Sequence, residues 1–356
     1  MSRHGVIKIF RWTGILFILF LQTLFQEGCL RKKAILDGGS GNAVLPQGYE
    51  NRFHQGMRYG LFIPPSYDST RIYPLVVGLH GSTDTVSWNL SYYHDPIQKT
   101  DPCFVLTPKS LVRNSGWGNS WEPDLSTDMR KTLEVIDSLK KEFNIDTTRL
   151  YVYGTSMGGF GVFSVLAKKP GLFAGAYSIC GGGNPQTAGA VMQTPLWIFH
   201  GSDDDVVPVT MSRNMVQAIL NAGGTQVRYT EYPGVKHAAW EPAGREPTLE
   251  SWLLVQRNGV KHSFPDTVEN FSSKTIQGRG VQVSWNPPSD AANPDNQVWY
   301  YRLFRDQQLL VELDKFHLTF LDSTAQGGVP RLYNASSVNY FFKESRRTTP
   351  VSVTVA

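Results

Sequence analysis

Residues 151–160 read YVYGTSMGGF, a stretch in which an apolar strand-like run gives way to small residues. Its first three residues are typical of a buried strand, and Ser156 then stands between Gly154 and Gly158. A serine at the tip of a sharp strand-to-helix turn takes a strained backbone conformation, and the residues two before and two after it crowd each other. Because only very small residues fit there, the stretch predicts a strand, a tight turn with an exposed hydroxyl, and a helix from about Met157.

Strand-like runs and helical patterns alternate on both sides of this stretch. The expected strands lie at 57–64, 73–81, 103–110, 149–154, 174–181, 195–201 and 226–234. The expected helices lie at about 128–143, from 157 to the KKPG at 168–171, between the last two strands, and at 247–257. Near-continuous apolar strands that alternate with helices indicate an α/β fold, a doubly wound and mostly parallel sheet covered on both faces.

The rhythm changes after Pro265, where alternating strands follow one another with turns and no helical pattern. This predicts a small all-β sandwich domain over 266–356, after an α/β domain over 49–262. The Trp285-Asn-Pro-Pro start, the Tyr-Tyr-Arg at 300–302 and the closing ESRRTTPVSVTV of the chain resemble a fibronectin type III module.

The first 29 residues are typical of an export signal, with basic residues followed by the apolar run TGILFILFLQTLF. Cys29 follows Gly28 directly after this run, as in a bacterial lipoprotein cleavage box, so the sequence predicts export and offers a lipid tether at Cys29. The alternatives are an ordinary secretory signal or an uncleaved anchor. Residues 30–48 contain LDGGSGN and read as a linker. The expected location is the periplasm, the cell envelope or the medium.

Composition excludes several classes of partner. The chain has 356 residues and a net charge of only +4, with no basic stripe of the kind that binds nucleic acid. Its other two cysteines, Cys103 and Cys180, each lie inside an apolar run and are expected to be buried thiols. No Cys-x-x-Cys or His-x-x-x-His spacing occurs, so we expect neither a metal nor a cofactor.

A nucleophilic serine needs a base and a group that orients the base, and candidates follow in the sequence. WIFHGSDDDVVP at 197–208 is a strand that ends in acids, and YPGVKHAAW at 232–240 is a strand that ends in His237. Serine, then acid, then histidine, each after a strand, is the chain order of the α/β-hydrolase fold. Over about 50–260 the chain resembles that superfamily, and more narrowly the exported esterases and predicted peptidases grouped with polyhydroxybutyrate depolymerase, feruloyl esterase and dienelactone hydrolase.

This resemblance implies roles for single residues. The superfamily motif His-Gly-x-x-Asp-x-x-Val-Pro places the catalytic acid at Asp204, although a slip of one residue would choose Asp203 or Asp205. His237, trailed by Trp240 as in the family pattern, is the expected general base. The remaining strand-end histidines, at 80 and 200, are expected to make only local hydrogen bonds.

The oxyanion formed on the substrate needs two amide donors. One is the backbone amide of Met157, which follows the serine. The family takes the other from the loop after VVGLHG, where Ser82 is the first choice and Thr83 the second. Trp117, Trp121 and Trp240 are candidates to line a substrate pocket, and the equally weighted alternative for the loop tryptophans is that they cover the core.

The sequence therefore predicts an exported serine hydrolase that cleaves small-molecule or polysaccharide-linked esters, such as acetyl or feruloyl esters, through an acyl-enzyme. A serine peptidase is an alternative, because the same triad cleaves amides, and an acyltransferase is another. A non-catalytic adhesion or carbohydrate-binding protein with this fold is the alternative from a different class.

Overall fold

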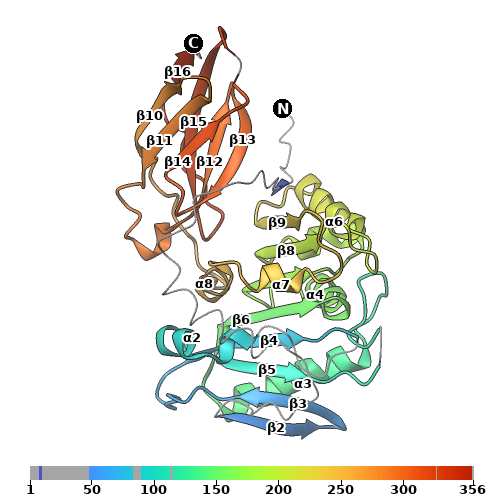
Figure 1. Ribbon diagram of the computed structural model, residues 1–356. Helices are drawn as coiled ribbons and strands as arrows, with labels where there is room; N and C mark the ends of the chain where they lie inside the picture. Colours follow the sequence, from blue (N-terminus) through green and yellow to red (C-terminus); the bar gives the residue numbers. More distant parts are fainter. Residues whose placement is uncertain (1–7, 10–47, 83–89, 113–114, 326, 355–356) are drawn as a thin grey trace, which may run out of the picture.

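The computed structural model describes residues 8–9, 48–82, 90–112, 115–325 and 327–354, and within them nine strands form one sheet. These strands are β1 (Lys8–Ile9), β2 (Tyr49–His54), β3 (Met57–Phe62), β4 (Tyr73–Leu79), β5 (Phe104–Pro108), β6 (Ile145–Thr155), β7 (Gly175–Ile179), β8 (Leu196–Gly201) and β9 (Val227–Tyr232). Their order across the sheet is β1-β9-β8-β7-β6-β4-β5-β3-β2 (Figure 1). The strands from β1 to β5 in that order pair in parallel, whereas β3 and β2 pair antiparallel. The prediction of a mostly parallel α/β sheet is confirmed.

Helices connect these strands and cover both faces of the sheet. They are η1 (Leu90–Tyr93), α2 (Asp95–Thr100), α3 (Thr127–Glu142), α4 (Met157–Lys168), η2 (Pro185–Thr187), α5 (Ala188–Val191), α6 (Thr210–Asn221), α7 (Trp240–Ala243) and α8 (Leu249–Val255). Helix α3 begins after Ser126, whose side chain accepts a hydrogen bond from the amide of Met129 at 3.1 Å. Such a cap satisfies one of the amides that a helix start leaves unpaired.

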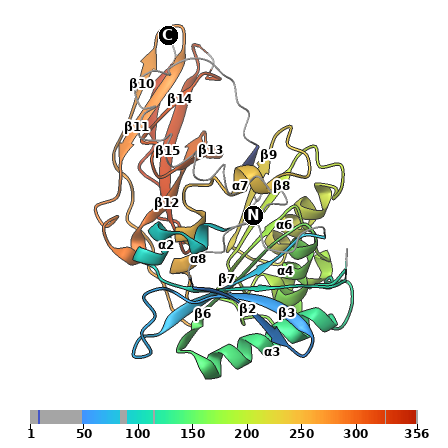
Figure 2. The same ribbon diagram turned by 60° about the horizontal axis from the view of Figure 1, so that its bottom comes forward.

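Alternation along the strands divides the apolar residues into two cores. In β4, Leu75 and Val77 face one core, which also contains buried side chains of α3, α4 and α6. Val76 between them faces the second core, together with Tyr151 of β6 and Trp252 of α8. Successive strand residues point to opposite faces, so both faces of these strands must be apolar. Figure 2 shows α3 on one side of the sheet and α2 and α8 on the other.

The chain after α8 folds into two further sheets, which together we call the carboxyl-terminal β module (residues 269–354). One sheet has the order β10-β11-β14 and the other β13-β12-β15-β16. Their bounds are β10 (Glu269–Ile276), β11 (Gly280–Asn286), η3 (Pro294–Asn296), β12 (Val298–Arg305), β13 (Gln308–Asp314), β14 (Thr319–Asp322), β15 (Pro330–Asn339) and β16 (Val351–Thr354). Val283 from the first sheet and Leu303 and Ala335 from the second share one buried core.

The β module packs against the nine-stranded sheet through a buried cluster of aromatic rings. Arg228 of β9 places its guanidinium 4.5 Å from the ring centroid of Trp197, 4.4 Å from that of Trp299 and 4.7 Å from that of Tyr300. Trp299 also stacks on Trp252 of α8 with ring centroids 5.4 Å apart. Trp197 and Arg228 are the second residues of their strands. The module therefore docks near the amino ends of β8 and β9, away from the edge where the parallel strands end.

The structure adds elements that the sequence patterns did not predict. Strands β2 and β10 and helix α2 were not expected. Strand β15 begins at Pro330, earlier than the strand-like run SVNYFFKES at 337–345 from which it was predicted. Cys103 and Cys180 are buried free thiols, as expected. The predicted signal and linker, Cys29 included, lie outside the described residues except for β1 and residue 48. No helix within the described ranges is long and apolar enough to cross a bilayer.

Replacing Trp299 with alanine tests the docking of the β module. Trp299 is 1% exposed and donates a hydrogen bond from its indole Nε1 to Thr248 Oγ1 at 3.0 Å. We expect Trp299→Ala to lower the free energy of unfolding by about 3–5 kcal/mol in chemical denaturation, because a large cavity opens in the cluster. The control, Phe316→Ala, removes a ring that is 66% exposed and should change stability by less than about 0.5 kcal/mol. Equal stability of the two variants would contradict this account.

Candidate functional site

Ser156 occupies the turn between β6 and α4 with a strained backbone, as its neighbours predicted. Its φ is +54° and its ψ is −116°, a region that costs a side-chain-bearing residue roughly 1–3 kcal/mol. The turn is held by the amide of Ser156, which donates to the carbonyl of Ile179 at 2.8 Å. A Cβ on Gly154 would lie 2.3 Å from the backbone of Gly158. The two glycines therefore allow the close approach on which the turn depends.

A histidine from a distant part of the chain contacts the Ser156 hydroxyl, and an aspartate contacts that histidine. His237 Nε2 lies 2.9 Å from Ser156 Oγ, across 81 residues of sequence. The other ring nitrogen, Nδ1, lies 2.8 Å from Asp204 Oδ2, across 33 residues. Because an ionised carboxylate only accepts, Nδ1 carries the proton and Nε2 offers its lone pair to the serine hydroxyl. The arrangement can take a proton from Ser156 and so make it a nucleophile.

Asp204, rather than either neighbouring aspartate, contacts His237. Asp203 accepts a hydrogen bond from Ser202 Oγ at 2.6 Å, and Asp205 forms an exposed ion pair with Lys236 at 2.9 Å. The hydrogen bond from Lys236 lowers the pKa of Asp205. The side chain of Asp204 is 0% exposed, whereas that of His237 is 19% exposed. The base is thus reachable from solvent, and the carboxylate that orients it is not.

The loop after β4, which contains Ser82, lies against the start of α4, which contains Met157. Leu79 pairs with Gly154 in the sheet, and a Cβ on Gly158 would lie 2.1 Å from the carbonyl oxygen of Leu79. Met157 is the first residue of α4, and Ser82 lies in the turn that follows the strand. Both amides therefore belong to the sheet edge that carries Ser156. Thr83 lies outside the described residues.

His80 makes one local hydrogen bond, as expected, and a second one to a residue that is distant in the sequence. Its Nδ1 donates to the carbonyl of Gly81 at 2.7 Å, and its Nε2 accepts from the amide of Ser110 at 3.0 Å. A neutral ring has one donor and one acceptor nitrogen, and these two bonds match the form protonated on Nδ1. The ring thus ties the loop after β4 to the end of β5.

The three tryptophans differ in their surroundings. Trp117 is 0% exposed and donates from its indole to the carbonyl of His80 at 2.9 Å, which favours the alternative that it covers the core. Trp121 is 46% exposed, with its ring 6.4 Å from that of Phe160 on α4. Trp240 presents its ring edge-on to His237, with centroids 5.6 Å apart. Trp121 and Trp240 thus remain candidates for substrate contact, and Phe160 is an aromatic neighbour that the sequence patterns did not single out.

His200 was expected to bond only locally, and the structure places it beside Asp204. Its Nε2 lies 3.2 Å from Asp204 Oδ2, and both side chains are 0% exposed. The spacing of the two residues does not predict this contact, because Asp204 lies on a loop beyond the end of β8.

One group of described residues offers metal-ligand atoms close together, namely Cys180, Asp204 and His237, whose atoms lie within 4.8 Å of one another. Burial raises the pKa of the Cys180 thiol, so this sulfur is protonated at neutral pH and is a poor ligand in that form. The histidine and the carboxylate are already hydrogen-bonded to each other. The arrangement thus suits a proton relay better than a resident metal ion.

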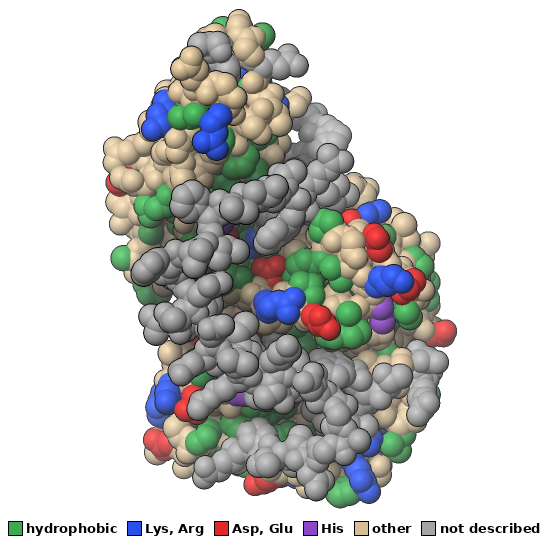
Figure 3. Space-filling view, viewed as in Figure 1, with side chains coloured by type: hydrophobic (Ala, Val, Ile, Leu, Met, Phe, Trp, Pro, Cys, Tyr) green, Lys and Arg blue, Asp and Glu red, His purple; other side chains and the backbone are tan. Residues whose placement is uncertain are grey.

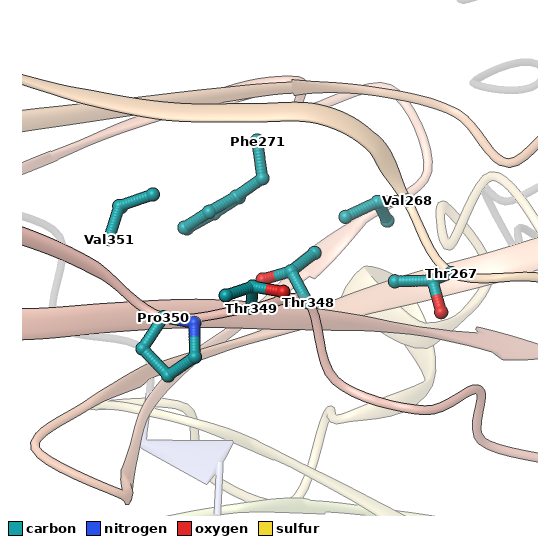
Figure 4. A pocket seen from close by; sticks show the side chains of 7 residues that line it. All are labelled: Thr267, Val268, Phe271, Thr348, Thr349, Pro350 and Val351. Atoms are coloured by element: carbon teal, nitrogen blue, oxygen red, sulfur yellow. The ribbon is translucent and has the colours of Figure 1, made fainter.

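A groove of about 360 Å³ lies at the β module, away from Ser156. Phe271 and Val351 line it together with threonines 267, 348 and 349, between β10 and β16 (Figure 4). On the described part of the face shown in Figure 3, Lys and Arg side chains are scattered among acidic ones. Neither feature adds a reactive group to the Ser156 site.

Comparison with known proteins supports the assignment of the α/β fold. The family model described as "Putative esterase" matches residues 51–262. The "Bifunctional acetylxylan esterase/xylanase" of Neocallimastix patriciarum is 31% identical over 137 residues, which are 38% of this chain and 20% of that protein. The "Probable feruloyl esterase C" of Aspergillus terreus is 27% identical over 221 residues, which cover 58% of this chain and 76% of that protein.

Among solved structures, a thermostable esterase aligns with a TM-score of 0.53 and 30% identity, covering 59% of this chain and 64% of its own. The chain thus spans a fifth of the fungal bifunctional enzyme and less than two thirds of the solved esterase. The predicted resemblance to α/β-hydrolase esterases is confirmed at the level of the family. The resemblance of the β module to fibronectin type III stays a prediction.

Replacing Gly154 with alanine tests the close approach in the turn. We expect Gly154→Ala to lower the free energy of unfolding by about 1–3 kcal/mol, because the new Cβ would overlap the backbone of Gly158. The matched control is Gly189→Ala in α5, where a Cβ would meet nothing within 4 Å. This control should be neutral or slightly stabilising, since alanine favours helix. Denaturation curves that rank the two variants in the opposite order would contradict the crowded turn.

Proposed function

From the premise that the chain belongs to the Putative esterase family, which its residues 51–262 match, we propose that it hydrolyses carboxylic esters through an acyl-enzyme. Ser156 is the nucleophile, His237 the general base and Asp204 the carboxylate that orients the base. The observation that carries the proposal is the continuous hydrogen-bonded chain from Ser156 Oγ through the imidazole to Asp204, at 2.9 and 2.8 Å.

The reaction follows from this geometry in two halves. His237 Nε2 takes the hydroxyl proton as Ser156 Oγ bonds to the ester carbon, and the backbone amides of Met157 and Ser82 stabilise the negative charge on the carbonyl oxygen. The imidazolium then gives its proton to the departing alcohol, which leaves an acyl group on the serine. Water, deprotonated by the same nitrogen, attacks the acyl group and releases the acid, and the proton returns to Ser156.

The substrate class that we propose is an acetyl or feruloyl ester, attached to a polysaccharide or to a small molecule. Its support is the names of the relatives, one an acetylxylan esterase and one a feruloyl esterase, neither of which this chain matches over its full length. The exposed ring of Trp121 beside Phe160 is suited to contact an aryl acid, since offset aromatic pairs stabilise one another by about 0.5–1.5 kcal/mol.

Export and domain organisation belong to the same proposal. The basic and apolar pattern of residues 1–29 supports an export signal, with Cys29 offered for lipidation. The three-stranded and four-stranded sheets of the β module, around one core, support a fibronectin type III-like sandwich.

An ester and peptide panel tests the proposed reaction. Full-length protein and Ser156→Ala are assayed on acetyl, feruloyl and longer-chain esters and on a peptide library, and both are treated with a fluorophosphonate probe. We expect wild type to cleave esters and to be labelled, and Ser156→Ala to lose kcat by on the order of 10⁶-fold and to escape labelling. Cleavage of peptides alone would replace the proposal with a peptidase. Folded wild-type protein without labelling or turnover would support a binding protein instead.

Substitution of the clustered aspartates tests the assignment of Asp204. We expect Asp204→Asn to lower kcat by about 10⁴-fold, because an amide that donates to Nδ1 imposes the wrong imidazole tautomer. Asp205→Asn is the matched control, since that exposed carboxylate contacts Lys236 and not His237. Its kcat should stay close to the wild-type value. A larger loss in Asp205→Asn than in Asp204→Asn would refute the assignment.

A further inference from the structure

The last residue but one of β8 is a fully buried histidine that the proposed reaction does not use. His200 is 0% exposed, and each of its ring nitrogens has a close partner. Nδ1 lies 2.7 Å from Ser212 Oγ on α6. Nε2 lies 2.9 Å from the carbonyl oxygen of Val207 and 3.2 Å from Asp204 Oδ2.

The partners of His200 determine which nitrogen carries the proton. A carbonyl and a carboxylate only accept hydrogen bonds, so Nε2 must be the donor. Burial lowers the pKa of His200, which keeps the ring neutral and leaves Nδ1 without a proton. Nδ1 therefore accepts from the hydroxyl of Ser212, whose other neighbour, the carbonyl of Gly181, is more distant at 3.3 Å.

The same contacts complete the surroundings of the Asp204 carboxylate. Oδ1 accepts from the amides of Val206 and Val207 at 2.9 and 2.8 Å. Oδ2 accepts from His237 Nδ1 at 2.8 Å and faces His200 Nε2 at 3.2 Å. Since the carboxylate has no exposed surface, the three N–H groups that donate to it and the nearby Nε2–H of His200, which also points to the carbonyl of Val207, replace its water. An unpaired lone pair there would be costly.

Asp204 lies on a loop, so its direction depends on such contacts rather than on a helix or strand. Oδ1 is held by the loop's own backbone, which moves with the aspartate. His200 belongs to β8, an interior strand that pairs with β7 and β9, and its ring is held from the other side by Ser212 on α6. The contact between His200 and Asp204 thus fixes the position of the carboxylate relative to the sheet.

We propose that His200 is a positioning residue that directs Asp204 toward His237, and that Ser212 holds the His200 ring in the required tautomer. This role rests on the proposed ester hydrolysis, because it acts through the same triad. The chain of polar contacts that supports Ser156 then extends from Asp204 through His200 to Ser212.

The test compares variants that keep or remove the donor at position 200. His200→Leu removes the donor, and His200→Gln keeps an amide N–H on a side chain of similar reach. Ser212→Ala removes the hydroxyl that holds the His200 ring. We expect His200→Leu to lower kcat by about 10–100-fold with KM unchanged, the size of effect that a small displacement in an active site produces. His200→Gln should recover most of kcat, and Ser212→Ala should fall between the two. His262→Leu, which removes a histidine stacked on Phe341 beside the β module, is the control and should leave kcat unchanged.

A second readout does not need ester turnover. The proton on His237 Nδ1, bonded to Asp204, should give a low-field proton resonance in wild type and in His200→Gln. It should shift or broaden in His200→Leu. Wild-type protein that shows the resonance without cleaving esters would refute the proposed function, while the resonance still tests the positioning role.

An unchanged kcat and an unchanged resonance in folded His200→Leu would overturn the proposal, as would a His200→Gln that is no better than His200→Leu. Should His200→Leu fail to fold, Ser212→Ala and His200→Gln decide the matter. A wild-type kcat and resonance in Ser212→Ala would then overturn the role of Ser212 in holding the His200 ring. A resonance lost in folded His200→Gln would overturn the role of an N–H donor at position 200.

Discussion

The close approach of two glycine backbones is the constraint on which the site depends. With hydrogen alone at Gly154 and Gly158, β6 can turn directly into α4, and Ser156 takes its positive φ at the tip. The loop after β4 packs onto the same helix start, because Gly158 also lies against the carbonyl of Leu79. One backbone contact thus brings together the hydroxyl, the helix amino terminus and the loop proposed to stabilise an oxyanion.

The parallel sheet assembles the rest by bringing strand ends to one edge. Asp204 follows β8 and His237 follows β9, and parallel neighbours place these loops side by side. The β module packs near the amino ends of the same strands, against Trp197 and Arg228, so it supports the sheet without covering that edge. Docking and the proposed chemistry therefore use opposite ends of two strands, and each can vary without disturbing the other.

Local patterns predicted much of the fold because each pattern has a local physical cause. The apolar runs of β4, β6 and β8 are buried on both faces, and this requirement is visible in composition alone. β2 escaped prediction because its residues, YENRFH, lie at a half-exposed edge and carry little apolar signal. The first half of β15 was missed for a similar reason, since it begins with the partly exposed residues PRL.

The sequence by itself determined that Ser156 would stand on a strained turn, that an acid and a histidine would follow in hydrolase order, and that an all-β region would come last. Residue size and strand period suffice for the turn and the all-β region, because steric limits on a tight turn and the period of a strand act within a few residues. The acid and the histidine were identified through the resemblance to the α/β-hydrolase family. Only the tertiary structure decided which of three adjacent aspartates meets His237, that Trp117 is sealed in the core, and that His200 supports the carboxylate. Such choices depend on loop paths and on contacts between segments far apart in the chain, which no local pattern records.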